Sequence, residues 1–422
     1  MSHPCRAMNR NTSRESNPRR LAWQCLQRWG QGGVFAETLI ERECSGLSPR
    51  NRAFVQAVVL GTLRNLRWLE HLCAQLRKGK LEDSARWLLL LGLCQLFVLH
   101  KPEHAAVGET VSLAPARLRG LVNGVLRNAT RRRDEFLAEL PQLSPGVRYS
   151  TPDWLVKRWM AEFGEEETLQ LLAWNVQVPP VYARINPLNP PQPGENWQPL
   201  AHAAGWFRLP AGLPLEELSA GRIYVADPST RYCVEMLAPQ PGERVLDACA
   251  APGGKSVAML GTTGGQIRLL ATDAESHRLP QLRENLRRTG ATAIAVQQHN
   301  WAEPCPDEWK AAFDAVLLDV PCSNSGVLQR RVDARWRLQP SEFERLAELQ
   351  LQILTRAAAA VRPGGRLVYS TCSIDRAEDQ AVVEAFLASH PDFSLQNDYL
   401  ALPHREQADG AYAALLYRTD NF

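Results

Sequence analysis

The sequence predicts a multidomain protein that combines an all-α helical bundle, a small mixed α/β module and a doubly wound α/β domain. Residues 21–133 show repeated helical periodicity without the alternation that is typical of strands. Six prolines between Pro179 and Pro193 interrupt the chain, and beyond Pro241 strand, loop and helix patterns alternate. A chain of 422 residues can hold two or three domains, each with its own core.

The N-terminal region should form four to six helices. Pro102 and Pro115 lie at predicted helix boundaries, because proline suits a first helical turn and breaks an interior one. The stretch from Trp87 to Leu99 is apolar nearly all round, which predicts a central helix. Residues 115–133 carry a run of arginines without an acidic residue. This run is either a solvated helix face or a nucleic-acid contact, and both interpretations stay open.

The middle of the chain predicts a small mixed module. A helical connector at 152–163 leads into the proline-rich segment, and short strand candidates lie at 181–186 and 222–225. The density of prolines excludes a long helix there. The predicted domains are therefore 1–142 for the helical domain, 143–235 for the connector and small module, and 236–422 for the C-terminal domain.

The C-terminal domain alternates strand and helix patterns, which implies a parallel sheet covered on both faces. The strand candidates are 244–247, 267–272, 293–296, 314–318 and 366–369, and the helix candidates are 279–289, 343–361 and 378–389.

Composition narrows the class of protein. With 45% hydrophobic residues and a net charge of +3, the chain should be globular, and any nucleic-acid surface must be local. Its ten cysteines include no C-x-x-C pair and no histidines at zinc spacing, so we expect no metal site. The polar first 20 residues lack the apolar core of a secretion signal, and the longest apolar stretch has 13 residues. We therefore expect a cytoplasmic protein with reduced thiols and no membrane contact.

A glycine-containing loop follows the first C-terminal strand, at residues 247–256. Gly253 and Gly254 allow a ligand to approach the backbone, and the following helix offers unpaired N–H groups. A phosphate loop would need glycine at position 249, which is a cysteine, and no G-x-G-x-x-G pattern is present. Asp273 ends the second strand, where it can accept hydrogen bonds from ribose hydroxyls. The pattern predicts S-adenosylmethionine as cofactor; a tight turn without a ligand is the alternative.

Two cysteine motifs stand directly after predicted strands: Asp319-Val-Pro-Cys322-Ser and Ser-Thr-Cys372-Ser. Parallel strands that end side by side would bring both thiols to the carboxyl edge of one sheet, where α/β folds bind ligands. Two thiols at this edge indicate covalent chemistry. The alternative is that one of them is only a small buried residue.

The two cysteine motifs and the loop at 249–255 together resemble the RNA 5-methylcytosine methyltransferases of the RsmB (Fmu/Sun) type. The N-terminal half is similar to the NusB-like domain of that branch in its motifs at 60–65, 100–110 and 120–127. Arg184-Ile-Asn, Asp227-Pro-Ser-Thr and Asp409-Gly-Ala-Tyr extend the resemblance over nearly the whole chain.

The resemblance implies an all-α NusB-like RNA-binding domain, a small RNA-binding module and a Rossmann-like methyltransferase domain. It makes Cys372 the nucleophile, Cys322 the residue that helps to release the product, and Asp319 a neighbour of both methyl group and base. Asn300 departs from the family, which has an acidic residue near the adenine, so we expect weaker cofactor binding. The implied cofactor contacts are Cys249, Ala250, Ala251, Pro252, Gly253, Gly254, Lys255, Asp273, Asn300 and Asp319.

The function implied by the resemblance is S-adenosylmethionine-dependent methylation of cytosine C5 in small-subunit (16S) ribosomal RNA through a covalent cysteine–C6 intermediate, with no obligate protein partner. The residues alone leave the nucleophile open, because Pro321-Cys322 resembles the Pro-Cys motif of DNA cytosine methyltransferases. The alternatives are a transfer-RNA cytosine-C5 methyltransferase and a non-catalytic RNA-binding, antitermination-like protein. Arginines around Trp336 are either phosphate contacts or the start of a surface helix.

Overall fold

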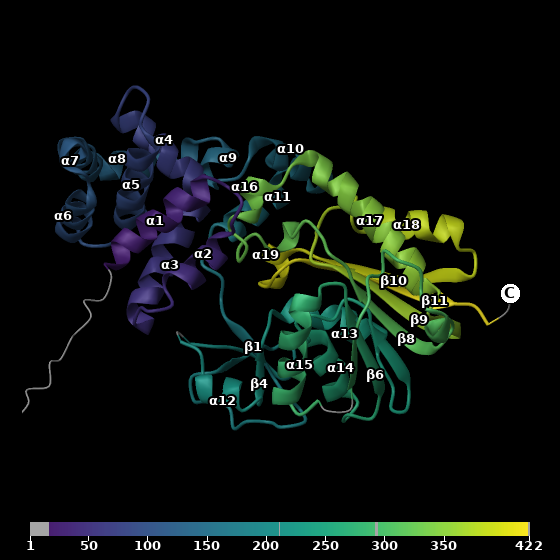
Figure 1. Ribbon diagram of the computed structural model, residues 1–422. Helices are drawn as coiled ribbons and strands as arrows, with labels where there is room; N and C mark the ends of the chain where they lie inside the picture. Colours follow the sequence, from purple (N-terminus) through teal and green to yellow (C-terminus); the bar gives the residue numbers. More distant parts are fainter. Residues whose placement is uncertain (1–16, 211, 292–293, 421–422) are drawn as a thin grey trace, which may run out of the picture. The chain divides into compact units, whose positions relative to one another are not determined.

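The structure is a computed structural model that describes residues 17–210, 212–291 and 294–420. The chain divides into two compact units, Met1–Glu165 and Glu166–Phe422 (Figure 1). The three-part division at 142/143 and 235/236 stays a prediction. Among the described residues, no helix is both long and apolar enough to cross a membrane.

The first unit is helical throughout its described part. Between residues 17 and 131 it forms seven α-helices, against the four to six predicted. The difference arises because α2 has only eight residues and because α3 and α4 are separate. The side chain of Asn65 donates to Gly61 O at 3.0 Å and so caps the end of α3. The helices are α1 (Pro18–Gly30), α2 (Ala36–Glu43), α3 (Pro49–Arg64), α4 (Leu66–Leu76), α5 (Asp83–Leu93), α6 (Glu103–Leu113), α7 (Ala116–Arg131), α8 (Arg133–Glu139), α9 (Pro145–Arg148) and α10 (Asp153–Phe163).

The predicted central helix is confirmed as α5, whose residues from Trp87 to Leu93 are all buried. The remainder of the predicted stretch continues as a π-helical turn, Cys94–Val98. The predicted arginine run lies mostly on α7. Arg117 forms an ion pair with Glu82 and Arg132 one with Glu135, at 2.7 and 2.6 Å. These pairs neutralise part of the run and favour a solvated helix face.

The second unit begins with a small module that confirms the two predicted short strands. Its four-stranded antiparallel sheet has the order β2-β3-β1-β4. The module follows α11 (Glu165–Asn175) and consists of β1 (Tyr182–Ile185), β2 (Gln198–Pro199), β3 (Trp206–Arg208), α12 (Leu215–Ser219) and β4 (Ile223–Val225).

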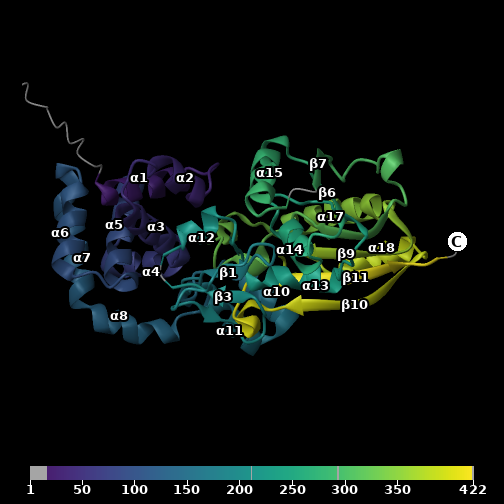
Figure 2. The ribbon, with the colours of Figure 1, turned by 90° about the horizontal axis from the view of Figure 1, so that it is seen from below.

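The large sheet has seven strands in the order β10-β11-β9-β8-β5-β6-β7. The five strands from β7 to β9 are parallel, as predicted, whereas β10 and β11 add an antiparallel edge that was not predicted. Figure 2 shows β9, β11 and β10 in this order. Of the predicted strand 293–296, residue 293 lies outside the described residues. The strands are β5 (Arg244–Asp247), β6 (Arg268–Asp273), β7 (Ile294–Gln298), β8 (Phe313–Asp319), β9 (Val361–Thr371), β10 (Phe393–Ala401) and β11 (Ala411–Arg418).

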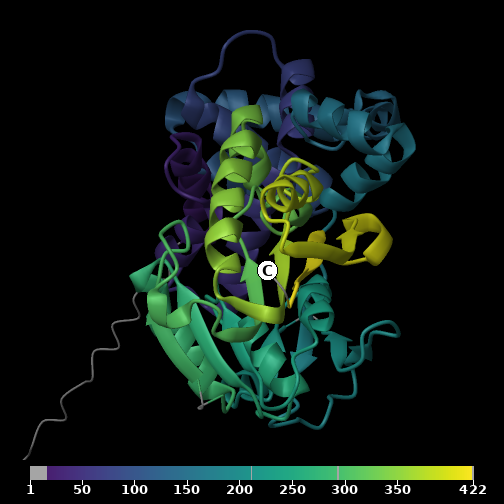
Figure 3. The same cartoon turned by 90° about the vertical axis from the view of Figure 1, so that its right-hand side faces the viewer.

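Helices cover both faces of this sheet because its strands are apolar on both sides. Along β8, Val316 and Leu318 pack into the core beside α17, whereas Ala315 and Leu317 pack into the core beside α14. In Figure 3 the green helix α17 and the yellow helix α18 lie on the same side of the sheet. The covering helices are α13 (Arg231–Leu237), α14 (Gly254–Thr262) and α15 (Leu279–Arg288) on one face, and α17 (Pro340–Ala358) and α18 (Gln380–Ser389) on the other.

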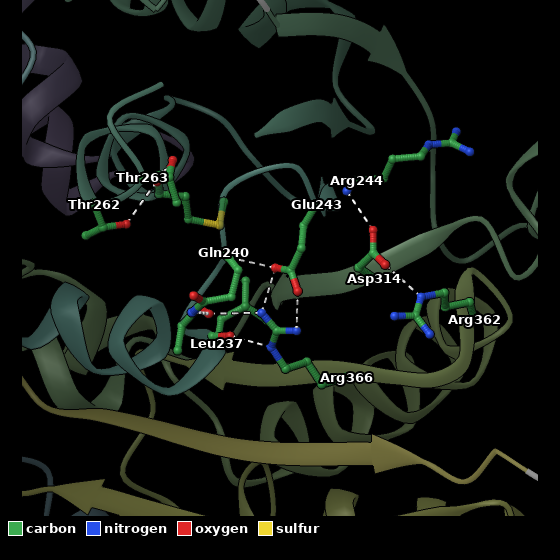
Figure 4. A network of polar contacts seen from close by, with 11 residues as sticks. Leu237, Gln240, Glu243, Arg244, Thr262, Thr263, Asp314, Arg362 and Arg366 are labelled. Carbon is green, nitrogen blue, oxygen red and sulfur yellow. Dashed lines mark hydrogen bonds and ion pairs between the residues drawn. The ribbon is translucent and has the colours of Figure 1, made fainter. Parts of the chain in front are cut away.

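At the amino ends of β5 and β8, charged side chains form a closed network (Figure 4). Arg366 donates to both carboxylate oxygens of Glu243 at 2.8 Å, and its Nε donates to Leu237 O at 2.6 Å. Asp314 accepts from the Arg244 N–H and from Arg362 Nε, each at 2.7 Å. This network joins β9 to the segment before β5, and β5 to β8, at the edge of the sheet opposite to the cysteine motifs.

Candidate active site

The carboxyl ends of the central strands bring the predicted motifs together. β5 ends at Asp247, β6 at Asp273 and β8 at Asp319, and in the register of β8 and β9 Asp319 lies opposite Ser370. The loops after these strands are therefore neighbours, as expected for a parallel sheet that binds its ligand beyond its carboxyl edge.

A cavity of about 410 Å³ opens at this edge. The cofactor loop lines one side, and β1, β3 and β4 of the small module line another. Its volume is within the range of small-molecule sites, which runs from about 300 to 1,000 Å³. The predicted cofactor contacts that line it are Cys249, Ala250, Ala251, Pro252, Gly254, Lys255 and Asp319.

Three predicted cofactor contacts do not line the cavity, and two of them hold the loop instead. Asp273 accepts hydrogen bonds from the Ala251 N–H and the Glu275 N–H, both at 3.1 Å. Gly253 has a φ of +105°, and a Cβ there would lie 2.9 Å from a Leu282 methyl carbon. Gly253 is thus required by the tight turn into α14. Whether Asp273 also contacts ribose stays a prediction.

The third of these residues, Asn300, follows β7. Its side-chain oxygen accepts a hydrogen bond from the Ala302 N–H at 3.0 Å, so it closes a local turn. The contact of Asn300 with adenine stays a prediction. In such a contact the Asn300 side-chain oxygen would accept from both the adenine amino group and the Ala302 N–H.

Lys255 and Asp319 form an ion pair in the cavity wall, with Nζ 2.6 Å from Oδ2. Burial lowers the pKa of Lys255, but Asp319, Cys233 and Asp247 together outweigh burial and hold the pKa of the ammonium above its usual value. Lys255 is therefore a fixed positive charge rather than a base.

The two cysteines are in direct contact, since Cys322 Sγ lies 2.7 Å from Cys372 Sγ. Cys372 Sγ also donates to the side-chain oxygen of Asn324 at 3.4 Å. The hydrogen bond with Cys372, followed by burial and by the charge of Glu378, raises the pKa of Cys322 well above its usual value. One thiol of the contact pair is therefore held protonated.

Glu378 joins the two cysteine loops, and the sequence interpretation missed it. It is fully buried and accepts hydrogen bonds from the Ser323 N–H at 2.9 Å and from Ser373 Oγ at 2.7 Å, one from each loop. Gln350 Nε2 of α17 donates to it as well, at 2.9 Å. The sequence offered one signal for such a residue, the serine that follows each cysteine. Buried polar groups need hydrogen-bond partners, and these two serines lie next to buried strands.

The arginines around Trp336 correct an expectation. Arg335 is fully buried and donates to the backbone oxygens of Asn175 and Leu328, each at 2.9 Å. Arg330 pairs with Asp227 and Asp409 at the cavity. These two arginines hold the protein together, so they do not form the phosphate-binding patch that was one interpretation of the sequence.

The residues of the cavity fit S-adenosylmethionine. Asp247 is fully buried, lines the cavity, accepts from Ser256 Oγ at 2.6 Å through one oxygen, and leaves the other without a hydrogen-bond partner among the described residues. Such an acceptor suits the ammonium group of an amino acid. No cluster of three or more histidine, cysteine or acidic residues that could bind a metal ion occurs in the described part of the chain.

Comparison with known proteins agrees with this geometry. Residues 234–417 match the family model of the 16S rRNA methyltransferase RsmB/F, and residues 16–131 match that of the NusB family. The chain is 33% identical over 439 residues to the ribosomal RNA small subunit methyltransferase B of Klebsiella pneumoniae, covering 96% of this chain and 99% of that protein. The Escherichia coli O6:H1 protein of the same description is also 33% identical, over 436 residues, with the same coverage.

Among solved structures, the crystal structure of PH0851 superposes with a TM-score of 0.75 at 21% identity, covering 96% of this chain and 99% of that one. NSun6 from Pyrococcus horikoshii, crystallised with SFG, has a TM-score of 0.54 at 19% identity and covers 64% of this chain and 99% of its own. At such identities the likeness concerns the fold. The near-complete similarity to the curated relatives, by contrast, decides the family: the chain belongs to the RsmB/F family and is an S-adenosylmethionine-dependent RNA cytosine-C5 methyltransferase.

Proposed function

We propose that this protein methylates a cytosine of small-subunit (16S) ribosomal RNA in the cytoplasm, with Cys372 as nucleophile and Cys322 as the residue that assists product release. The observation that carries a covalent mechanism with two cysteines is the contact between their sulfurs, 2.7 Å apart, beside the loop of Asp319. The resemblance to the family supports Cys372 as the nucleophile. The names of the relatives, which describe a small-subunit methyltransferase, support the choice of substrate.

A covalent mechanism explains why two thiols are needed. C5 of cytosine is a weak carbon nucleophile, and addition of a thiolate to C6 converts the ring into an enamine whose C5 can attack. S-adenosylmethionine supplies the methyl group, activated by attachment to a positively charged sulfur. After transfer, a base removes the proton from C5, the C6–S bond breaks, and the electron pair returns to the cysteine sulfur.

The resemblance to the family assigns the attack to Cys372, and a protonated Cys322 is compatible with that assignment. Because the pKa of Cys322 is raised by its hydrogen bond to Cys372, by burial and by Glu378, Cys322 keeps its proton at neutral pH. As a thiol it can donate a hydrogen bond to the Cys372 sulfur. Once the Cys372 sulfur is bonded to C6, Cys322 is close enough to act in the elimination, directly or through water.

Asp319 is our candidate for the contact with the base. Attack at C6 moves electron density towards N3, which then needs a proton or a strong hydrogen bond. Asp319 lines the cavity, and Lys255 holds one of its oxygens at 2.6 Å. When its carboxyl group is protonated, Asp319 can supply the hydrogen bond that N3 needs. The fixed ammonium of Lys255 thereby stabilises negative charge on this side of the ring.

The assignment of the cysteines is tested with Cys322→Ala and Cys372→Ala in the presence of RNA and S-adenosylmethionine. We expect Cys322→Ala to accumulate a covalent protein–RNA complex, seen as an RNA-dependent shift on a denaturing gel, because release is slowed. Cys372→Ala should form none and lose activity at least about a thousandfold. A shifted band with Cys372→Ala alone would exchange the two roles.

The substrate is tested by incubating the protein with labelled S-adenosylmethionine and separated RNA pools. Label in 16S ribosomal RNA is expected. Label in transfer RNA instead would replace the proposed substrate, and label in neither pool would contradict catalysis on both. Mapping of 5-methylcytosine in 16S ribosomal RNA, from cells with and without the gene, then locates the nucleotide.

A further inference from the structure

The cavity contains three basic side chains, and two of them are neutralised by the protein. Lys255 pairs with Asp319 at 2.6 Å. Arg330 pairs with Asp227 at 2.7 Å and with Asp409 at 2.8 Å. The third is Arg184, which belongs to β1 of the small module and lines the same cavity.

Arg184 has no carboxylate partner among the described residues. Its Nε is buried and makes no hydrogen bond, and its described contact is a face-on one with Trp206, 5.9 Å from the ring centroid. Burial lowers the pKa of Arg184 to about 10, and the one titratable group that opposes this is Tyr224. At neutral pH its guanidinium is therefore charged, largely removed from water and unpaired.

A buried, unpaired charge is costly, and proteins keep such a charge where a ligand compensates it. The guanidinium presents its N–H groups in a planar fork that fits the two oxygens of an anion. What compensates Arg184 must therefore be an anion that enters the cavity from outside.

The neighbours of Arg184 indicate which anion this is. In the register of the small sheet, Arg184 lies opposite Trp206 on β3 and opposite Tyr224 on β4, and both rings line the cavity. An arginine between two aromatic rings is a typical arrangement for a nucleotide, because the rings contact a base or ribose while the arginine holds a phosphate.

The proposed substrate supplies such an anion by necessity. A cytosine whose base reaches Asp319 brings its own backbone phosphates to the mouth of the cavity. The other two cations are already engaged by carboxylates, so Arg184 is the basic side chain of the cavity lining that remains for a phosphate. Resting on the function proposed above, we propose that Arg184 binds a backbone phosphate of the RNA next to the target cytosine, with Trp206 and Tyr224 as flanking contacts.

The proposal is tested by binding rather than by turnover. The probe is a short single-stranded fragment of 16S ribosomal RNA, selected for tightest binding, with its phosphates replaced one at a time by uncharged methylphosphonate. For the wild-type protein one replacement should weaken binding about tenfold. Arg184→Gln should bind the unmodified RNA about tenfold more weakly and should be insensitive to that same replacement. The slope of log K against log salt concentration should be smaller in magnitude by about 0.7, the value for one phosphate contact on a single strand.

Two controls separate this contact from general effects. Arg222→Gln removes a charge from the same module, where Arg222 is partly exposed and paired with Glu217 at 3.1 Å, and should leave the RNA affinity within about twofold. The affinity of Arg184→Gln for S-adenosylhomocysteine, measured by calorimetry, should be unchanged, which also verifies folding. Arg184→Lys keeps the charge and should recover the salt dependence, so the proposal stays testable if the glutamine variant fails to fold.

Three results would overturn the proposal. The first is a wild-type protein that is insensitive to every methylphosphonate, and the second is an Arg184→Gln protein that binds RNA like the wild type. The third is a loss of S-adenosylhomocysteine affinity with RNA affinity intact, which would assign Arg184 to the cofactor carboxylate. Binding is measured here without methylation. If the protein binds RNA through Arg184 but does not methylate that RNA, only the proposed function is contradicted.

Discussion

Buried polar groups differ between the two ends of the strands of the large sheet, the amino edge and the carboxyl edge. At the amino edge, Arg366 meets both oxygens of Glu243, and no atom of the network in Figure 4 is among the buried polar atoms without a partner in the described structure. Around the cavity at the carboxyl edge, Asp247 Oδ1, Asp409 Oδ1 and Arg184 Nε of the adjoining small module are all buried without a hydrogen bond among the described residues. The amino edge is built for stability, whereas the carboxyl edge keeps groups for ligands at a cost in stability.

Breaking the amino edge should give the largest change in stability. Arg366→Gln removes four hydrogen bonds, two to the Glu243 carboxylate and one each to the carbonyls of Leu237 and Ala238. Gln240 still donates to Glu243 and to Ala238 O. Because Arg366 and Glu243 are only 13% and 17% exposed, we expect a loss of about 3 kcal/mol in the free energy of unfolding. Urea unfolding of the full chain measures this loss, and methyl transfer per folded molecule should not change.

The matched control is Arg362→Gln in the same network. Arg362 is 47% exposed, and its partner Asp314 keeps the hydrogen bond from the Arg244 N–H. A loss below about 1 kcal/mol is expected. Equal losses for the two variants would contradict the view that burial makes the Arg366 pair important.

At the carboxyl edge, a substitution should stabilise the protein. Burial raises the pKa of Asp247 to about 6, above its value in the unfolded chain, although Ser256 opposes the shift. The unfolded chain thus loses its proton at lower pH than the folded one, and stability falls as pH rises from about 4 to about 6. Asp247→Asn removes this dependence and should gain about 2 kcal/mol at pH 7.5.

The measurement is the melting temperature of Asp247→Asn and wild type across this pH range. The advantage of the variant should be nearly absent at pH 4 and complete above pH 7. The same variant should bind S-adenosylhomocysteine less tightly, because an amide offers no charged acceptor to the ammonium group. A variant that is less stable at every pH would show that Asp247 is a structural residue like Glu243.

The sequence predicted the fold class and most of the elements because periodicity and strand length follow directly from local patterns. The helix predicted at 279–289, for instance, is α15 at Leu279–Arg288. The motifs also predicted that the loop at 249–255 and the two cysteines would meet at one edge. The antiparallel strands β10 and β11 were not predicted. Strand β11 pairs with β9 across the intervening helix α18, β10 pairs with β11, and no local pattern specifies such partners.

The roles of single polar residues were beyond the sequence for a similar reason. Glu378 was taken as the first residue of a helix, and its hydrogen bonds to Ser323 and Ser373 exist only once both loops are folded. Arg330 belonged to a basic run that looked free, yet two carboxylates from distant segments neutralise it. Charge in a sequence indicates what can pair, and only the fold decides what remains unpaired.

The smallest expected effect concerns Asn300, where the carboxyl edge lacks a charge that the family has. Because Asn300 uses its side-chain oxygen for the Ala302 N–H, Asn300→Asp would keep that turn and add a second, charged oxygen for the adenine amino group. Affinity for S-adenosylhomocysteine, measured by calorimetry, should rise about threefold to tenfold. Gln298→Glu, which adds the same charge at the end of β7, should leave the affinity unchanged; an equal gain in both variants would attribute the effect to long-range charge rather than to a hydrogen bond.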